Sequence, residues 1–235
     1  MVATSGWLQG LGVSPQLVQR YVASGWLEPV ATGVFKRPGE TLTWQGALHS
    51  LQVQSNLAVH VGALTALSAE GSAHYLRLGR ETVLLFSKAG VGLPAWFKAR
   101  DWAADLRHTQ TGFLPPDLGV RDAMVGGFSL KASAPERAIL ESLHLAPQAV
   151  DLMEAYQVLE GLRTLRPALM QSLLDACGSI KVKRLFLFMA EKAGLPVLSR
   201  LRTEDLDLGS GDRALVKGGV YVPRHRLVLP PELAA

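Results

Sequence analysis

The sequence predicts an α+β protein in which an N-terminal winged helix-turn-helix is joined to a mixed α/β C-terminal part. Two observations support this fold class. Within the first 40 residues, two short helical segments with a glycine turn between them lead directly into a β-hairpin. Farther along, strand-like segments give way near Ala132 to helical ones. We therefore expect domains at residues 1–42 and 43–235, the second with a small sheet and a helical second half that divides near residue 132.

Composition narrows the class of protein. The 235 residues are 48% hydrophobic and 19% charged, which is typical of a compact folded chain and not of a disordered one. No apolar run is long enough to cross a bilayer, and the first ten residues lack the pattern of a secretory signal. The single cysteine, Cys177, excludes an internal disulfide and a cysteine-rich zinc site, and we expect a buried, inert thiol. We therefore expect a cytoplasmic protein without membrane contact.

The charge of the chain favours an acidic partner but is unevenly distributed. The formal charge is +4 and the pI is near 9.4. Residues 1–40 contain three basic and two acidic side chains, whereas residues 163–202 contain eight basic and two acidic ones. The most basic region is therefore not the predicted winged helix, which any hypothesis of DNA binding must accept.

The helix-turn-helix is predicted from its capping residues. Ser5–Leu11 forms the first helix, and a glycine lies in the turn that follows. Ser14 precedes a proline, which is the pattern of an N-cap followed by a first helical residue that needs no N–H partner. Gly25 lies where a helix C-terminus favours a positive φ, and we expect Trp26 and Leu27 to pack back onto the helix.

The second helix of this pair is amphipathic. Its apolar stripe consists of Leu17, Val18, Tyr21 and Val22. Its opposite face consists of Gln16, Gln19, Arg20 and Ala23. Glutamine amides pair with adenine edges and arginine pairs with guanine in the major groove, so this face has the chemistry of a recognition helix. The alternative is an ordinary solvated helix face, and the hairpin that follows favours the recognition helix over it.

The hairpin is predicted from strands at Leu27–Val30 and Val34–Arg37 with a glycine-containing turn between them. Lys36 and Arg37, which we expect at the tip of this wing, would contact phosphates without sequence specificity. A winged helix normally has a further helix before the pair, and only Met1–Thr4 precede the first helix here. Three explanations are open: the true start of the chain lies upstream, the domain is trimmed, or another segment supports the helix pair in place of that helix.

The middle of the chain indicates a small sheet backed by helices. Helices are predicted at Thr43–Gln54 and at Val59–Glu70, the second ending at Gly71, and a block HYLRLG covers residues 74–79. Strands are predicted at Thr82–Ser87, Leu106–Leu114 and Gly127–Lys131. The order in which these strands pair does not follow from one sequence.

The last hundred residues are mainly helical. Ser133 and Glu136 have the spacing of a capping box that opens a helix through Leu145. Further helical segments are predicted near 148–162, 167–177 and 180–193. A final hairpin is expected from 213–220 and 221–229, turning around Pro223. The capping box explains Glu136 without an active site, and a structural pair of Glu136 with Arg137 stays open.

The helix near 180–193 carries basic residues beside an apolar side. Lys181, Lys183 and Arg184 lie in this segment, and Lys181 and Arg184 share one face. A solvated helix face is one interpretation. The others are a contact with a partner protein, or phosphate contacts that compensate for the modest charge of the winged helix.

Several sequence blocks occur together in a specific order. The first is WLQGLGVSPQLVQRYVASGWLEPVATGVFKRPG, and HVGALTAL, HYLRLG, LPAWF, SAPERAILESL and CGSIKVKRLFLFMAEKAG follow it. In these blocks the chain resembles the AbiEi family, which are antitoxins of bacterial type IV toxin–antitoxin systems. The resemblance spans nearly the whole chain, and the main departure is less helix before SGWL than is usual.

The resemblance implies a transcriptional autorepressor and antitoxin. Its winged helix would bind double-stranded promoter DNA at inverted repeats, and an antitoxin domain at 43–235 would counteract a cognate nucleotidyltransferase toxin. Direct contact between antitoxin and toxin stays open. On this resemblance the recognition-helix positions are Ser14, Gln16, Gln19 and Arg20, and the wing positions are Lys36 and Arg37.

Two other classes of function compete with this one. A protein-interaction module whose winged helix does not bind DNA fits the short N-terminus. An enzyme is not expected: the six histidines never show metal-site spacing, and no G-x-S-x-G motif is present. Asp205, Asp207 and the Gly209–Ser210 turn faintly resemble a nucleotidyltransferase site, but there the turn precedes the acidic pair. We expect no catalytic residues, no metal and no cofactor.

Overall fold

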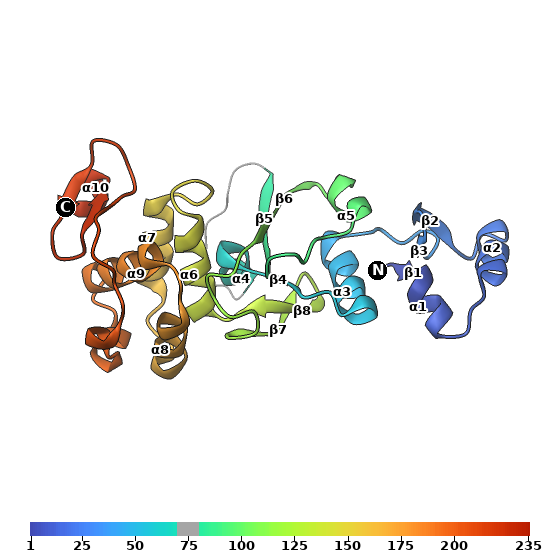
Figure 1. Ribbon diagram of the computed structural model, residues 1–235. Helices are drawn as coiled ribbons and strands as arrows, with labels where there is room; N and C mark the ends of the chain where they lie inside the picture. The colour runs from blue at the N-terminus through green and yellow to red at the C-terminus, as the bar shows by residue number, and fades with distance from the viewer. Residues whose placement is uncertain (70–79) are drawn as a thin grey trace.

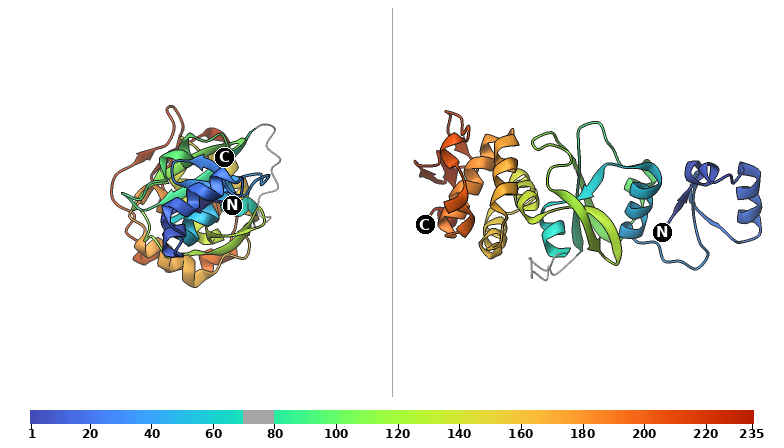
Figure 2. Two further views of the ribbon diagram at one scale, coloured as in Figure 1. Left: turned by 90° about the vertical axis from the view of Figure 1, so that its right-hand side faces the viewer. Right: turned by 90° about the horizontal axis from the view of Figure 1, so that it is seen from below.

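The computed structural model describes residues 1–69 and 80–235. The molecule is elongated, with a small N-terminal module at one end, a β-sheet in the middle and a group of helices at the C-terminal end (Figure 1). The view from below shows the same three parts in a row (Figure 2, right). An α+β architecture is thereby confirmed. The predicted end of a helix at Gly71 and the HYLRLG block lie outside the described residues.

The N-terminal module has the strand and helix order of a winged helix. Its elements are β1 (Ala3–Thr4), α1 (Ser5–Gly10), α2 (Pro15–Ala23), β2 (Glu28–Ala31) and β3 (Val34–Lys36). The three strands form an antiparallel sheet in the order β1-β3-β2. The residues before α1 therefore form an edge strand of the wing sheet instead of a helix.

Support for this edge strand comes from α3 (Trp44–Ser55), which follows the wing in sequence. The backbone N–H of Val2 donates to Ser50 Oγ at 3.0 Å, and that of Thr4 donates to Gln54 Oε1 at 2.9 Å. Gln54 Nε2 donates in turn to the Val2 carbonyl at 2.6 Å. Side chains of α3 thus satisfy the backbone groups that an edge strand leaves unpaired. The residues before α1 are thus supported by another segment, α3.

The central sheet has five strands in the order β6-β5-β4-β8-β7. They are β4 (Val59–Val61), β5 (Glu81–Ser87), β6 (Ala104–Gln110), β7 (Val120–Val125) and β8 (Phe128–Ser133), and the short helix α5 (Ala95–Ala99) lies between β5 and β6. Helix α3 lies on the side of the sheet that faces the N-terminal module, and α4 (Ala63–Ala69) and α6 (Pro135–Leu145) lie on the other side (Figure 1, Figure 2).

The prediction of one helix from Val59 to Glu70 is wrong at its start. Val59, His60 and Val61 are a buried strand, and the helix begins only after Gly62. A Cβ atom on Gly62 would lie 2.4 Å from Glu141 Oε2 and 2.5 Å from the Phe86 ring, so only glycine fits there. The close approach of Glu141 therefore marks the point where strand ends and helix begins.

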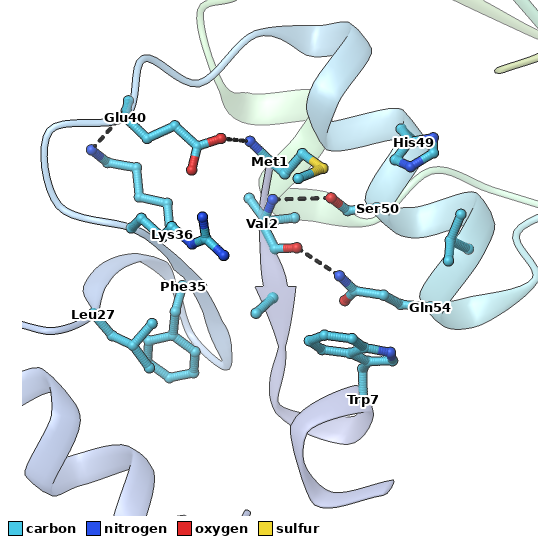
Figure 3. Close-up of a pocket in the computed structure, with 13 residues that line it drawn as sticks. Met1, Val2, Trp7, Leu27, Phe35, Lys36, Glu40, His49, Ser50 and Gln54 are labelled. Carbon is cyan, nitrogen blue, oxygen red and sulfur yellow. Dashed lines mark hydrogen bonds and ion pairs between the residues drawn. The ribbon is translucent and has the colours of Figure 1, made fainter. Parts of the chain in front are cut away.

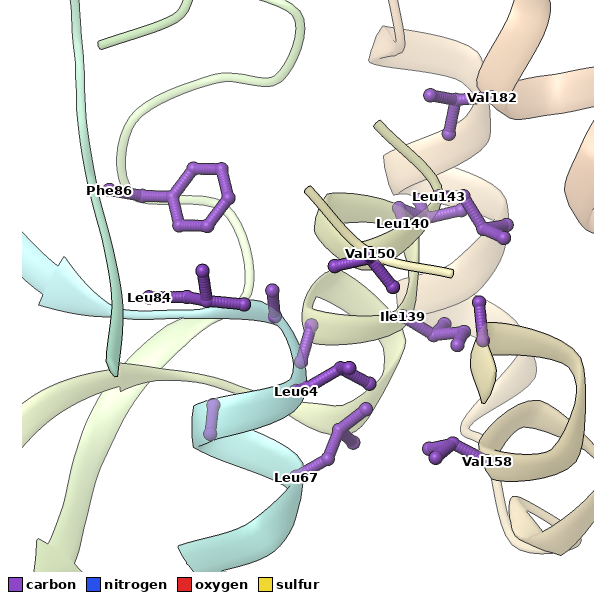
Figure 4. Close-up of a cluster of buried hydrophobic side chains, with 14 of the residues drawn as sticks. Leu64, Leu67, Leu84, Phe86, Ile139, Leu140, Leu143, Val150, Val158 and Val182 are labelled. Carbon is purple, nitrogen blue, oxygen red and sulfur yellow. The ribbon is translucent and has the colours of Figure 1, made fainter. Parts of the chain in front are cut away.

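The helical part surrounds α6. Its other helices are α7 (Leu152–Gly161), α8 (Pro167–Ala176), α9 (Ile180–Lys192) and the 3-10 turns η1 (Pro196–Arg200) and η2 (Thr203–Asp205). Apolar side chains of α4 and β5 meet those of α6, α7 and α9 in one core (Figure 4). In the described part of the chain, no helix is both long and apolar enough to cross a bilayer. Cys177 is buried as expected, and burial raises the pKa of its thiol.

Two local predictions for the C-terminal half are wrong. The N-cap of α6 is Ala134 without a side-chain cap, because Ser133 Oγ donates to Glu141 and Glu136 accepts from Arg166. The open pairing of Glu136 with Arg137 is likewise replaced by separate partners. The final hairpin is shorter than expected: β10 (Val220–Val222) pairs with β11 (Leu227–Leu229), and β9 (Arg213–Ala214) joins in parallel, before α10 (Pro231–Ala234).

Glu141 is fully buried and connects the sheet to the helices. Its carboxylate accepts from Arg137 Nε at 2.7 Å, from Ser133 Oγ at 2.7 Å and from His60 Nε2 at 2.9 Å. The backbone N–H of Ala63 is a fourth donor at 3.0 Å. Burial by itself would raise the pKa of Glu141, but His60, Arg137 and Ser133 lower it to about 2. The folded state therefore strongly favours the charged form.

We expect Glu141→Gln to lower the free energy of unfolding by about 3 kcal/mol at neutral pH, since each pKa unit corresponds to about 1.4 kcal/mol. A carboxyl group whose pKa is lowered by folding stabilises the folded state at pH values above its pKa in the unfolded chain. That stabilisation is lost as the pH falls toward its pKa in the folded state. The gap between the wild type and the variant should therefore be full above about pH 5 and shrink toward pH 2. Urea unfolding across this range measures it, with exposed Glu204→Gln as control. A gap independent of pH would contradict this account.

Candidate nucleic-acid interface

Helix α2 begins and ends as its sequence predicts. Ser14 Oγ accepts a hydrogen bond from the N–H of Leu17 at 3.2 Å, and a proline occupies the first helical position. At the other end Gly25 has φ +72°, and the N–H of Trp26 donates to the Tyr21 carbonyl at 2.8 Å. This is the Schellman arrangement, in which a left-handed glycine lets the chain turn back over the last helical turn.

The polar face of α2 points outward at the end of the molecule. Gln16, Gln19 and Arg20 are all exposed, and within residues 1–69 and 80–235 their side chains have no hydrogen-bond or ion-pair partner. Figure 1 shows α2 at the extreme N-terminal end, farther from the central sheet than the wing or α1, and the right-hand view of Figure 2 agrees. Nothing in the described chain covers these side chains.

The apolar stripe of α2 is less buried than the sequence predicts. Val18 is buried, Leu17 and Val22 are half-buried, and Tyr21 is 38% exposed. The expected packing of Trp26 onto the helix is wrong, because its indole is 73% exposed. A turn made of a left-handed glycine reverses the chain but does not by itself bury the residue that follows. The sequence therefore does not reveal that Trp26 is a surface residue.

Trp26 lies beside Arg37 at the C-terminal end of α2. Together with Ser24, Gly25 and Pro38 they line a shallow open hollow. Arg37 is exposed and has no ion-pair partner in the described chain. An exposed indole beside a free guanidinium can contact both the sugars and the phosphates of a nucleic acid strand. The hollow extends the exposed polar face of α2 toward the wing.

Lys36 and Arg37 do not lie at the tip of the wing. The tip is Thr32–Gly33, where Gly33 has φ +70° and its carbonyl accepts from the N–H of Ser5 at 2.8 Å. Lys36 is the last residue of β3 and Arg37 follows it, so both lie at the opposite end of the hairpin, close to the end of α2. The glycine turn, and not the basic pair, thus marks the hairpin tip.

Lys36 is also less available than expected. Its half-buried ammonium forms an ion pair with Glu28 on the neighbouring strand and donates to the Glu40 carbonyl at 3.0 Å. The hydrogen bond from Lys36 is the main cause that lowers the pKa of Glu28. Because Glu28 neutralises it, Lys36 adds little positive potential to the surface. We call the surface formed by Gln16, Gln19, Arg20, Trp26 and Arg37 the α2–wing face; within the described chain, Arg20 and Arg37 are its free cations.

A mainly apolar cavity of about 290 Å³ separates the wing from α3. Figure 3 shows Leu27 and Phe35 of the wing on one side and Gln54 of α3 on the other, with the hydrogen bonds of Val2 between them. Trp7 also lines it. This cavity contains no cluster of reactive groups and marks the seam between the N-terminal module and the rest of the molecule.

The basic residues of α9 have structural contacts instead of free surface. Lys183 and Arg184 are buried, and the guanidinium donates to the carbonyls of Leu208, Gly209, Gly211 and Arg226 at 2.6–3.2 Å. Lys183 Nζ donates to the Asp207 carbonyl at 3.0 Å. The half-buried Lys181 donates to the carbonyls of His144 and Ala146, both at 2.7 Å. These contacts correct the expectation that Lys181, Lys183 and Arg184 are exposed for phosphates or a partner.

The acidic residues that faintly resembled a nucleotidyltransferase site do not converge. Asp205 is exposed and lies 3.7 Å from Arg202, and Asp207 Oδ1 accepts from the N–H of Gly209 at 2.9 Å. Among the described residues, no three histidine, cysteine, aspartate or glutamate side chains lie close enough to hold a metal ion. The α2–wing face is therefore the strongest candidate site.

Comparisons with known proteins agree with this geometry. A family model described as a transcriptional regulator, AbiEi antitoxin of a type IV toxin–antitoxin system, matches residues 80–230. The model of the N-terminal domain of such regulators matches residues 1–78. These matches include α3 with the N-terminal module, whereas the sequence predicts a boundary after residue 42, which stays a prediction.

A solved structure has a similar fold. The crystal structure of the RV2827C protein from Mycobacterium tuberculosis matches with a TM-score of 0.62 and 16% sequence identity, covering 97% of this chain and 86% of that chain. No curated protein matches significantly. At this identity the solved structure supports the fold alone.

We expect Arg184→Met to destabilise the protein by about 3 kcal/mol or more, because it leaves several buried carbonyls without a donor. Arg184→Lys should lose less, since an ammonium still donates to some of them. Urea unfolding measures both, and the exposed Arg200→Met is the matched control, with an expected change within about 0.5 kcal/mol. A loss no larger than that of the control would show that Arg184 is not a structural residue.

Proposed function

The chain belongs to the AbiEi family of antitoxin transcriptional regulators from type IV toxin–antitoxin systems, and on that premise we propose that it represses its own operon through α2 and the wing. In this proposal α2 enters the major groove of double-stranded promoter DNA at inverted repeats. A two-fold repeat would be occupied by two copies of the chain, one in each half-site.

The exposed face of α2 carries the proposal. Gln16, Gln19 and Arg20 are free of intramolecular partners, so their amide and guanidinium groups are available for base edges without first breaking a protein contact. Ser14 uses an oxygen lone pair to cap the helix and keeps its hydroxyl hydrogen for a phosphate. Arg37 and Trp26 would contact the backbone beside the groove.

The charge of this face sets the strength of binding. With Lys36 paired to Glu28, Arg20 and Arg37 are the free cations that each copy brings on α2 and the wing, counted over residues 1–69 and 80–235. Few phosphate contacts mean weak nonspecific binding and a shallow dependence on salt. Repression would therefore depend on base contacts and on two copies at one repeat.

DNA binding is tested by fluorescence anisotropy with promoter and scrambled duplexes. We expect Arg20→Ala to lose about 1–3 kcal/mol on the promoter and most of its preference over the scrambled duplex. Arg37→Ala should weaken both duplexes equally and lower the salt slope by about 1. Arg200→Ala, an exposed arginine in the C-terminal helical part, is the control. Equal binding of wild type to both duplexes would contradict the proposal.

A protein-interaction module is the second candidate function, favoured by the pairing of Lys36 with Glu28 and the thin charge of the winged helix. This alternative predicts no binding to the promoter even at about 50 mM salt, where phosphate contacts are strong. The same titration therefore separates the two hypotheses.

We further propose that the cognate toxin is a nucleotidyltransferase and that residues beyond the winged helix counteract it. Co-expression with the toxin tests this: Arg20→Ala should restore growth as well as the wild type while it no longer represses a promoter reporter. This outcome follows because α2, which carries Arg20, lies at the end of the molecule farthest from the C-terminal helices (Figure 1). Failure of both proteins to restore growth would remove the antitoxin proposal for that toxin.

A further inference from the structure

A second cavity, of about 240 Å³, lies where the central sheet splits between β4 and β8. These strands share one residue pair, Val61 with Ala132, and then separate. Beyond it the side chain of Gln52 on α3 bridges them: its Nε2 donates to the Val59 carbonyl at 2.7 Å, and its Oε1 accepts from the N–H of Lys131 at 3.1 Å. The cavity is lined by residues of α3, β4, β5, β8, α6 and the segment 111–120, and does not include α2 or the wing.

His60 is one of three buried polar residues that line this cavity within the described chain, with Ser87 and Arg137. The residue is 6% exposed, its ring stacks on Phe86 with centroids 6.0 Å apart, and its Nε2 lies 2.9 Å from Glu141 Oε1. An ionised carboxylate only accepts hydrogen bonds, so Nε2 carries the hydrogen of this contact. Nδ1 has no protein partner within the described chain, so in the imidazolium, where both ring nitrogens carry hydrogens, it donates to an anion while Nε2 donates to Glu141.

Cations predominate in the lining. Lys88, Lys131 and Arg137 line the cavity together with a single carboxylate, that of Asp117. Lys88 is exposed and has no ion-pair partner in the described chain. Lys131 pairs with Asp122 at 3.0 Å, but both side chains are more than half exposed, and such pairs contribute little. Arg137 is held by Glu141 and by the carbonyls of the 111–120 loop.

The remaining walls are largely apolar, with Phe86 and Leu114 among them. Apolar walls with a few convergent polar groups are typical of small-molecule sites, and the volume lies just below their usual range of about 300–1,000 Å³. An occupant that uses both features is small, negatively charged and partly apolar.

We propose that this cavity binds a small organic anion, a carboxylate or phosphate monoester with a flat apolar group. Its charge lies toward His60 and the two lysines, and its apolar part lies against Phe86. A purely structural role explains why Glu141, Arg137 and Ser133 are buried together. It leaves unexplained both the unused Nδ1 of His60 and the lysines around a cavity with apolar walls. The inference does not depend on DNA binding.

The test uses the full chain without DNA and two probes, phenyl phosphate and benzoate, titrated by calorimetry and by NMR of the histidine rings. We expect saturable binding of at least one probe with a shift of the His60 resonances. Inorganic phosphate and benzyl alcohol, which each lack half of the chemistry, should bind at least about tenfold more weakly. Equal affinity for either of them, or saturation by neither probe, would overturn the proposal.

Variants locate the site. His60→Gln and Lys88→Gln should each weaken the better probe by roughly tenfold, and Lys98→Gln, an exposed lysine of α5 outside the lining, should not change it. Lys88 is exposed, so its replacement keeps the test valid even where His60→Gln does not fold. Unchanged affinity in Lys88→Gln, or an equal loss in Lys98→Gln, would show that the anion binds elsewhere or nonspecifically.

Discussion

The buried carboxylate of Glu141 is the contact on which the rest of the C-terminal part depends. Its four donors come from β4, the start of α4, the end of β8 and α6, so one side chain joins segments about 80 residues apart in sequence. Burying an ionised carboxylate costs several kcal/mol unless every lone pair is matched, so the four segments must meet at one place. Gly62 is glycine for the same reason, since Glu141 occupies the space that a Cβ atom would need.

The same principle recurs farther along the chain. Glu136 in the first turn of α6 binds both the backbone and the guanidinium of Arg166 at the start of α8, and Arg184 of α9 holds the irregular segment after residue 207 by its carbonyls. Charged side chains of buried helices thus organise connections that have little regular structure of their own. A consequence is that the net charge of the chain overstates its surface potential, because several of its cations point inward.

The sequence predicts the winged helix-turn-helix well because its signals are local. Capping by Ser14, the left-handed Gly25 and a polar face at helical spacing need only neighbouring residues, and the structure confirms each of them. The helices of the C-terminal half were located within a few residues for the same reason. The roles of Gln16, Gln19 and Arg20 at DNA stay predictions, although their exposure was anticipated.

The wrong predictions involve contacts between distant residues. Ser133 and Glu136 have capping-box spacing, but Ser133 donates to Glu141 and Glu136 accepts from Arg166 instead of capping the helix. Strand β7 was missed because its sequence, VRDAMV, places two charges together on an edge strand. The basic segment of α9 was interpreted as surface because nothing local reveals the carbonyls, 24 to 42 residues away, that bury Arg184.

The contact between α3 and β1 determines how the N-terminal module is oriented. Three hydrogen bonds between the backbone of β1 and the side chains of Ser50 and Gln54 fix the orientation of the N-terminal module with respect to the rest of the elongated molecule. With α2 in a groove, as proposed, the rest of the molecule would project away from the duplex, because α2 lies at one end of the molecule and the C-terminal helices lie at the other. Two copies on one operator would then extend separately from the DNA. Each would leave its C-terminal helices accessible to another macromolecule while its N-terminal module stays bound to the promoter.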